Sequence, residues 1–233
     1  MLCEDDGITA ELWLGALIDA GAPADRIQAA LDASGAAARL VAERCEAREV
    51  AATRIRLETD ASAPRVDTVA ALQERITAAG LGERAHDRVR AVADALAGAE
   101  ATVHGVALEA VRFHELGRPH TVARLIAGAV ALDLLEIDEV TCSPVALGRG
   151  VLQIAHGRFP VPPPAVLALL HGFTVQGGSR AGELTTPSGA AVLAGLARPS
   201  DAIPVMRLER HGRGVIGADD QERLLTVMIG TAA

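Results

Sequence analysis

The fold class follows from residues 119–154, PHTVARLIAGAVALDLLEIDEVTCSPVALGRGVLQI. Apolar residues recur at helical spacing through residues 119–136, and Pro119 fits the first turn of a helix because its missing N–H is not needed there. Two strand-like runs follow, over residues 138–147 and 151–154, joined by a glycine-rich turn. A helix that leads directly into short strands predicts a mixed α/β or α+β fold.

Helices and strands also alternate along the rest of the chain. Further helices are expected over residues 8–20, 23–34, 67–103 with a break near Gly80 and Gly82, 165–170 and 188–197. Further strands are expected over residues 37–45, 50–58, 174–176, 205–209 and 224–229. We therefore predict a single α+β domain over residues 1–233, with small sheets packed against a mainly helical middle segment. The alternative is two lobes, a mixed one of residues 1–62 with 138–233 and a helical one of residues 63–137.

Composition excludes several classes of function. The 233 residues include no lysine, asparagine or tyrosine, one tryptophan and three phenylalanines, and the formal net charge is −8. No Schiff-base or P-loop lysine is therefore available, and an acidic chain with few aromatic rings is poorly suited to nucleic acid. No apolar run is long enough to cross a bilayer, and the start lacks a secretion signal. We expect a cytoplasmic protein without a nucleic-acid or membrane partner.

Two loops that contain histidine are candidates for chemistry. His114 and Glu115 lie at a helix-to-loop break with His120 six residues further on, and His156 follows a predicted strand. Imidazole and carboxylate groups in such loops act as metal ligands or as an acid–base pair. An isolated histidine is more often a hydrogen-bonded surface residue, so both interpretations stay open.

The start of the helix expected over residues 188–197 is a candidate anion site. Hydroxyl groups and the free N–H groups of a first helical turn together form a cradle for phosphate. Glu183 would repel an anion unless a cation lies between them, so a metal-bridged phosphate is one interpretation. Helix capping alone also explains Thr186 and Pro187. The cradle residues are Thr185, Thr186, Ser188 and Gly189.

The N-terminal segment is acidic and is a further candidate site. Carboxylates gathered in one segment can hold a divalent cation, although a solvated acidic loop is the commoner explanation. The acidic residues are Glu4, Asp5, Asp6 and Glu11.

The wording and order of several motifs resemble one known family. FHELG at 113–117 resembles the family's F-H-E-V-G, and SPVALGRG at 143–150 resembles S-P-L-P-L-G-S-G. AHG at 155–157 followed by PVPPPA at 160–165 resembles A-H-G followed by P-V-P-A-P-A, and GELTTPSGAA at 182–191 resembles G-E-L-V-T-P-T-G-A-A. The chain thus resembles, over nearly its whole length, the N-terminal domain of the LarC family. These are the nickel-insertion proteins of the nickel-pincer cofactor of lactate racemase.

The resemblance implies an activity and a set of site residues. The family uses CTP to insert nickel into a pyridinium mononucleotide that carries two thiocarboxylates, so nickel is the expected metal, with manganese or magnesium beside the nucleotide. The implied catalytic residues are His114, Glu115, His156 and Glu183. The implied metal ligands are His114, His120, His156 and Glu11, and the cradle residues would bind the cofactor phosphate. The family's C-terminal CTP-binding domain is expected to be absent. A partner protein that supplies it and a homo-oligomer are the associations left open.

The chain departs from the family at polar loop positions, while the apolar framework stays. Where the family opens D-C-F-S-G-I-S-G-D-M, residues 3–12 read CEDDGITAEL, and His120 stands where the family has an acid. Three hypotheses remain. They are a LarC-like nickel-insertion enzyme or accessory protein, a metal-independent acid–base or cyclase-type enzyme on a small molecule of specialised metabolism, and a non-catalytic binding or assembly module. The first is preferred, and all three assume that the acidic start, the histidine loops and the hydroxyl-rich helix start share one pocket.

Overall fold

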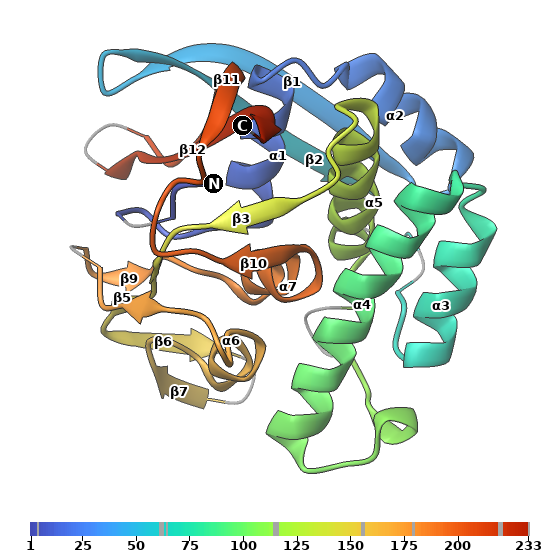
Figure 1. Cartoon of the computed structure of the whole chain (residues 1–233). Coiled ribbons are helices and arrows are strands. Elements are labelled where there is room, and N and C mark those ends of the chain that lie inside the picture. The colour runs from blue at the N-terminus through green and yellow to red at the C-terminus, as the bar shows by residue number, and fades with distance from the viewer. Residues whose placement is uncertain are drawn as a thin grey trace.

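Helices and strands are mixed throughout the computed structural model (Figure 1), which describes residues 1–3, 5–60, 63, 65–113, 117–154, 157–178, 180–218 and 221–232. Its helices are α1 (Ala10–Asp19), α2 (Ala24–Ala33), α3 (Val69–Ala78), α4 (Glu83–His104), the 3-10 turn η1 (Leu108–Ala110), α5 (Pro119–Leu134), α6 (Pro164–Leu169) and α7 (Pro187–Leu196). Its strands are β1 (Ala38–Ala47), β2 (Val50–Thr59), β3 (Val140–Cys142), β4 (Val145–Ala146), β5 (Gly148–Arg149), β6 (Val151–Ile154), β7 (Gly157–Pro160), β8 (Val175–Gln176), β9 (Gly182–Glu183), β10 (Ala197–Pro199), β11 (Met206–Ile216) and β12 (Arg223–Ala232). The predicted α+β class is confirmed.

Local sequence explains where the helices begin and end. The Thr9 hydroxyl caps α1 by accepting a hydrogen bond from the Leu12 N–H at 3.1 Å. Pro119 occupies the first turn of α5 as predicted, and Gly105 ends α4 in the left-handed conformation that glycine adopts without strain. No helix in the described part of the chain is both long enough and apolar enough to span a bilayer.

The largest sheet carries α1 on one face. Among the described residues it has the strand order β1-β2-β11-β12, in which β2 and β11 are parallel and the two outer pairs are antiparallel. Helix α1 lies close to β11 because the strand presents glycine to it. A Cβ atom at Gly214 would stand 1.8 Å from the Leu12 carbonyl oxygen, and one at Gly212 would stand 2.3 Å from that of Ala16.

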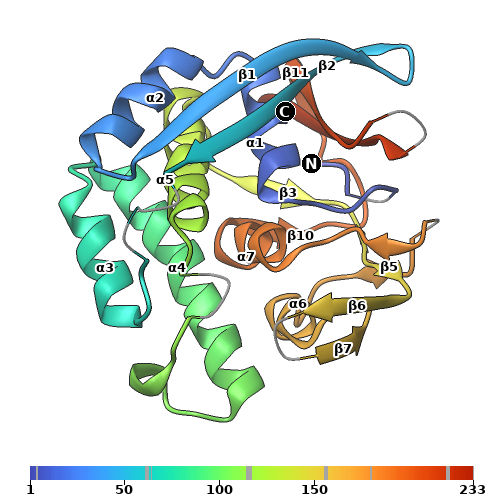
Figure 2. The same ribbon diagram turned by 180° about the vertical axis from the view of Figure 1, so that it is seen from behind.

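Residues 1–3 extend this sheet beyond β12. The Leu2 N–H donates to the Thr226 carbonyl at 3.0 Å, in an antiparallel bridge. On the other side, the Met1 nitrogen donates to the Thr141 carbonyl at 2.9 Å and the Ser143 N–H donates to the Met1 carbonyl at 3.0 Å. That pattern is typical of parallel strands, so residues 1–3 lie between β12 and β3. Figures 1 and 2 both show the N-terminus in this place.

The helical part packs against the sheet through α5. This helix is buried on nearly all sides and contacts α1, α2 and α4. The Trp13 ring of α1 lies over Gly128 of α5, where a Cβ atom would stand 2.1 Å from the ring. Figure 2 shows α3 and α4 on the far side of α5 from the large sheet. The buried apolar residues of both parts form one continuous cluster, and the division into two lobes stays a prediction.

Two predicted strands differ from the observed ones. The strand expected over residues 138–147 is divided into β3 and β4, because Pro144 has no N–H to continue the ladder. The strand expected over residues 205–209 is longer and continues as β11 to Ile216. Its glycines lower the strand propensity of the sequence, but the packing of α1 requires them.

Candidate functional site

The acidic N-terminal segment and the start of α7 meet in the structure. The Ile8 N–H donates to the Thr185 hydroxyl at 3.2 Å, and the Thr186 N–H donates to the Ile8 carbonyl at 3.1 Å. A Cβ atom at Gly189 would stand 2.1 Å from that same carbonyl oxygen, so glycine allows the close approach. Two of the segments expected to share a pocket therefore lie side by side.

The hydroxyl groups at the start of α7 have different roles. The fully buried Thr185 hydroxyl donates to the Ala146 carbonyl at 2.7 Å and accepts from Ile8, so it holds the fold together. The Thr186 hydroxyl caps α7 by accepting from the Gly189 N–H at 3.3 Å, and it lies 3.2 Å from the Ser188 hydroxyl. Thr186, Ser188 and the first-turn N–H groups remain as the part of the cradle that could receive an anion.

Asp6 is a buried carboxylate that gathers arginines. It is 4% exposed, accepts a hydrogen bond from the Leu224 N–H at 3.0 Å and forms an ion pair with Arg48, whose Nη2 lies 2.8 Å away. Its other oxygen lies 3.6 Å from Arg180 Nε. A buried charge of this kind persists only where it is paired and hydrogen-bonded.

Further ionic groups tie distant segments to Asp6. The Glu222 carbonyl accepts from Arg48 and from Arg180, and the Glu222 carboxylate lies 3.2 Å from Arg54 Nη2. The tip of the β1–β2 hairpin, the loop before β9 and the β11–β12 turn therefore converge. We name this group the Asp6 cluster; its members are Asp6, Arg48, Arg54, Arg180, Glu183, Glu222 and Arg223.

Glu183 is the member whose ionisation is most perturbed. Burial raises the pKa of the Glu183 carboxyl from 4.5 to about 7, against the opposing effect of the Arg223 charge. Arg223 in turn donates to the backbone carbonyls of Glu183 at 2.9 Å and Leu184 at 2.8 Å. Burial lowers the pKa of Arg223, while the charges of Asp6 and Glu183 raise it. Glu183 thus exchanges a proton near neutral pH, as an acid–base group requires.

Glu11 takes part in a separate ion pair between helices. It lies in the first turn of α1 and contacts Arg124 Nη2 of α5. Burial lowers the pKa of Arg124, and its Nε atom is buried without a hydrogen-bond partner among the described atoms. Glu11 is therefore engaged by a guanidinium, and its role as a metal ligand stays a prediction.

Of the remaining predicted site residues, the structure describes only His120. His120 is half-buried in the first turn of α5, whereas His114, Glu115 and His156 lie outside the described residues. Within the described ranges, no group of three or more histidine, cysteine, aspartate or glutamate side chains is arranged to hold a metal ion. The structure therefore brings Glu183 together with the start of α7 and leaves the histidine loops as predictions.

The amino-acid sequence matches the model of a known protein family. The family model described as nickel insertion protein matches residues 2–232. The chain belongs to this family. The residues that match the nickel insertion family include the main sheet, α5 and the Asp6 cluster.

Several curated relatives in the nickel insertion family cover nearly the whole chain. Proteins from Syntrophotalea carbinolica and Thermomicrobium roseum, whose names give nickel insertion as an unproven function, are 36% and 41% identical over 97% and 89% of the chain. A pyridinium-3,5-bisthiocarboxylic acid mononucleotide nickel insertion protein from Geobacillus kaustophilus is 30% identical over 96% of it. The chain spans 58%, 52% and 57% of these three relatives, respectively. No solved structure matches the chain.

Sequence reasoning missed the arginines of the site. Arg48, Arg180 and Arg223 belong to three segments that carry none of the family motifs quoted above. One signal pointed to them: without lysine, every cationic side chain that meets an anion at neutral pH must be arginine, apart from protonated histidine. That signal gives the residue type but not the three positions.

Proposed function

We propose that the chain acts in nickel insertion into a pyridinium-3,5-bisthiocarboxylic acid mononucleotide, the compound in the name of the Geobacillus relative. Nickel is then a substrate, and small-molecule binding takes place at the Asp6 cluster and the start of α7. Membership of the nickel insertion family over residues 2–232 supports the reaction class.

One observation carries the choice of site: arginines of the β1–β2 hairpin, the loop before β9 and the start of β12 converge on Asp6, on Glu222 and on the loop that leads into α7. A mononucleotide with two thiocarboxylates is strongly anionic. Guanidinium groups bind phosphate and carboxylate with paired hydrogen bonds, and the first turn of a helix adds N–H donors. Thr186 and Ser188 would then contact the phosphate, while Arg180 and Arg223 face the remaining negative charge.

Glu183 fits a second part of the reaction. Binding of Ni²⁺ to an organic ligand displaces protons from that ligand, and a carboxylate with a pKa of about 7 accepts one at neutral pH. In this proposal His114, Glu115 and His156 join Glu183 in catalysis. His114, His120, His156 and Glu11 supply nickel ligands, and CTP is used with manganese or magnesium.

The test is direct formation of the product. The purified chain is incubated with Ni²⁺ and the mononucleotide, with and without CTP, and nickel-containing mononucleotide is measured by mass spectrometry. Because the chain spans about half of its relatives, a second series adds the remaining part of the Geobacillus protein as a separate polypeptide. Failure to form the nickel product in both series contradicts the proposal. Turnover of another small molecule without nickel would favour the metal-independent hypothesis.

Matched arginine variants test the site. Arg223→Gln and Arg180→Gln should raise the KM for the mononucleotide by about ten- to a hundredfold, because a hydrogen bond to a charged group contributes about 1.5–3 kcal/mol. Arg90→Gln is the control, since Arg90 is an exposed residue of α4 that pairs with Asp94 at 3.6 Å. Equal KM values for all three variants would remove the Asp6 cluster from the binding site.

A further inference from the structure

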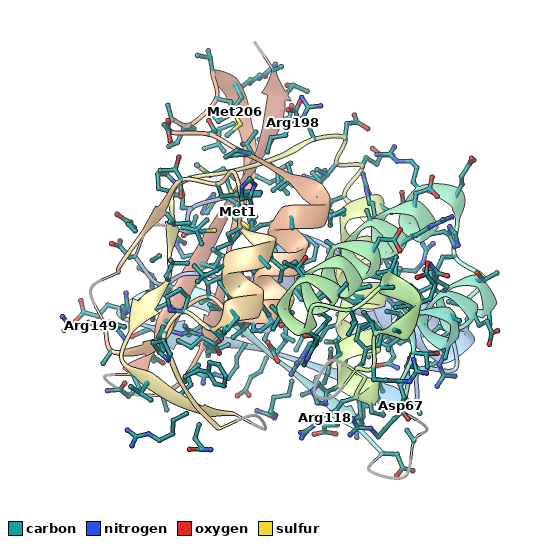
Figure 3. The ribbon with its side chains drawn as sticks, turned by 90° about the horizontal axis from the view of Figure 1, so that it is seen from below. Met1, Asp67, Arg118, Arg149, Arg198 and Met206 are labelled. Atoms are coloured by element: carbon teal, nitrogen blue, oxygen red, sulfur yellow. The ribbon has the colours of Figure 1, made fainter. Side chains whose placement is uncertain are left out.

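A groove of about 870 Å³ lies beside the N-terminus, between β12 and β3. Its floor is apolar and comes from Trp13 and Leu17 of α1, Leu132 of α5 and Leu135 directly after α5. Figure 3 shows Met1 and Met206, which both line the groove, on the side of the molecule away from Asp67 and Arg118. We name it the strand groove, for the reason that follows.

The walls of the strand groove are the edges of two strands. The Thr226 carbonyl of β12 points toward Leu2. Successive residues of a strand point their backbone N–H and C=O groups to opposite edges, so those of Met228, Gly230 and Ala232 point to the same side as Thr226. Within the described ranges, β12 pairs on this outer side only at Thr226. Thr141 presents its carbonyl from the opposite wall. The groove therefore continues the line of residues 1–3 and has a free strand edge on β12.

The side chains around the groove favour a particular kind of segment. Apolar residues at the mouth are unusually exposed, with Val205 at 84% and Ile203 at 56%. Two of the five rim carboxylates are already paired, Asp138 with Arg84 at 2.8 Å and Glu139 with Arg198 at 3.3 Å. The other three have no arginine partner among the described residues and face only Arg210 and the Met1 amine, so the rim keeps a small excess of negative charge. An apolar floor with an acidic rim is complementary to a strand whose apolar residues alternate with basic ones. The acidic rim residues are Glu136, Asp138, Glu139, Asp201 and Glu209.

We propose that the strand groove binds an extended segment of a partner protein. The segment adds as a strand antiparallel to β12 and parallel to β3, as residues 1–3 do. Its apolar side chains, at every second position, enter the floor against Trp13 and Leu17. Arginine or lysine at the positions between them faces the rim. The inference does not depend on the proposed nickel chemistry.

A synthetic peptide tests the proposal on the intact chain. The probe is the acetylated and amidated hexapeptide RVKVRV, and the readout is the emission of Trp13, the single tryptophan in a chain without tyrosine. We expect a saturable change in emission that weakens with added salt, because part of the attraction is between charges. The peptide EVDVEV, of opposite charge, and VVVRKR, without alternation, should bind at least about tenfold more weakly.

Two variants locate the binding. Met228→Pro removes an N–H that points into the groove, at an edge position where proline is tolerated. It should weaken binding about three- to tenfold, as loss of one hydrogen bond predicts. Met228→Leu is the matched control and should bind normally. A variant with RVKVRV joined ahead of Met1 should fill the groove and abolish binding of the free peptide.

Several results would overturn the proposal. Equal binding of the three peptides, or an unchanged affinity of Met228→Pro, would show that no strand is added. Stabilisation by the joined segment without any binding of free peptide would assign the groove to the chain itself. A dimer that covers the strand groove in the absence of peptide would assign it to a second copy. Urea unfolding of each variant checks that Met228→Pro keeps its fold.

Discussion

The Asp6 cluster and the strand groove lie at different places along the same first segment of the chain, and they are built from different interactions. At Asp6, side-chain charges from four segments pair with one another around one buried carboxylate. At the groove, backbone edges and apolar side chains remain open beside residues 1–3. The first region should therefore respond to changes of charge and pH, and the second to changes of shape and backbone hydrogen bonding.

Removal of the Asp6 carboxylate is the change expected to matter most. Asp6→Ala removes the acceptor of the Leu224 N–H and the negative charge that faces Arg48 and Arg180. It should lower the free energy of unfolding by about 3–5 kcal/mol. Urea unfolding measures the loss. The exposed neighbour gives the control, because Asp5→Ala should change the free energy by less than about 0.5 kcal/mol. A loss under 1 kcal/mol for Asp6→Ala would mean that the cluster does not stabilise the fold.

The floor of the strand groove should respond to shape. Gly128→Ala places a methyl group against the Trp13 ring and should cost about 1–3 kcal/mol, with a change in Trp13 emission. Gly98→Ala lies in α4 with open space around it, and should instead stabilise the protein by about 0.4–1 kcal/mol. Thermal unfolding of the pair gives opposite signs; a common sign would show that Trp13 is not closely packed on α5.

Stability at the Asp6 cluster should depend on pH through Glu183. The folded carboxyl has a pKa of about 7 and an unfolded glutamate one near 4.5, so between these values the folded protein holds a proton that the unfolded chain has lost. Unfolding therefore becomes easier as pH rises from about 4.5 to 7. Glu183 is partly exposed, so we expect an effect of about 1–2 kcal/mol. Glu183→Gln should remove this part of the slope in urea unfolding curves; an unaltered slope would refute the raised pKa.

The smallest change in the free energy of unfolding is expected for an exposed ion pair on the β1–β2 hairpin. Arg56 lies 3.9 Å from Glu43 across the two strands, and both are largely exposed. Arg56→Ala should change the free energy of unfolding by less than about 0.5 kcal/mol, because water and salt screen such pairs. A loss comparable with that of Asp6→Ala would indicate that burial does not set the strength of these ion pairs.

The sequence predicted the features that depend on near neighbours. Thr186 was expected to cap a helix start, and it caps α7, because capping is settled within three residues. The sequence also identified Glu183 and the hydroxyl residues beside it, which the structure places next to the N-terminal segment. The division of the long strand at Pro144 was missed because neighbouring strand signals were read as one.

Features set by distant contacts were not predictable from sequence. The turn at Arg48 and Glu49 has positive φ at both residues, a conformation that usually selects asparagine and glycine. Arg48 is held there by Asp6 and Glu222, which are remote in the chain. The length of β11 likewise depends on α1, which needs glycine opposite it. Single-sequence patterns contain neither contact.

The pairing of Leu2 with Thr226 has a consequence for synthesis in the cell. Residues 1–3 leave the ribosome more than two hundred residues before Thr226 of their neighbour β12. Helices α3, α4 and α5 are able to pack as they emerge, since α4 contacts both of its neighbours in the chain. The side of residues 1–3 that faces β12 stays unpaired until that strand emerges, and chaperones that recognise extended apolar segments can bind it during that time.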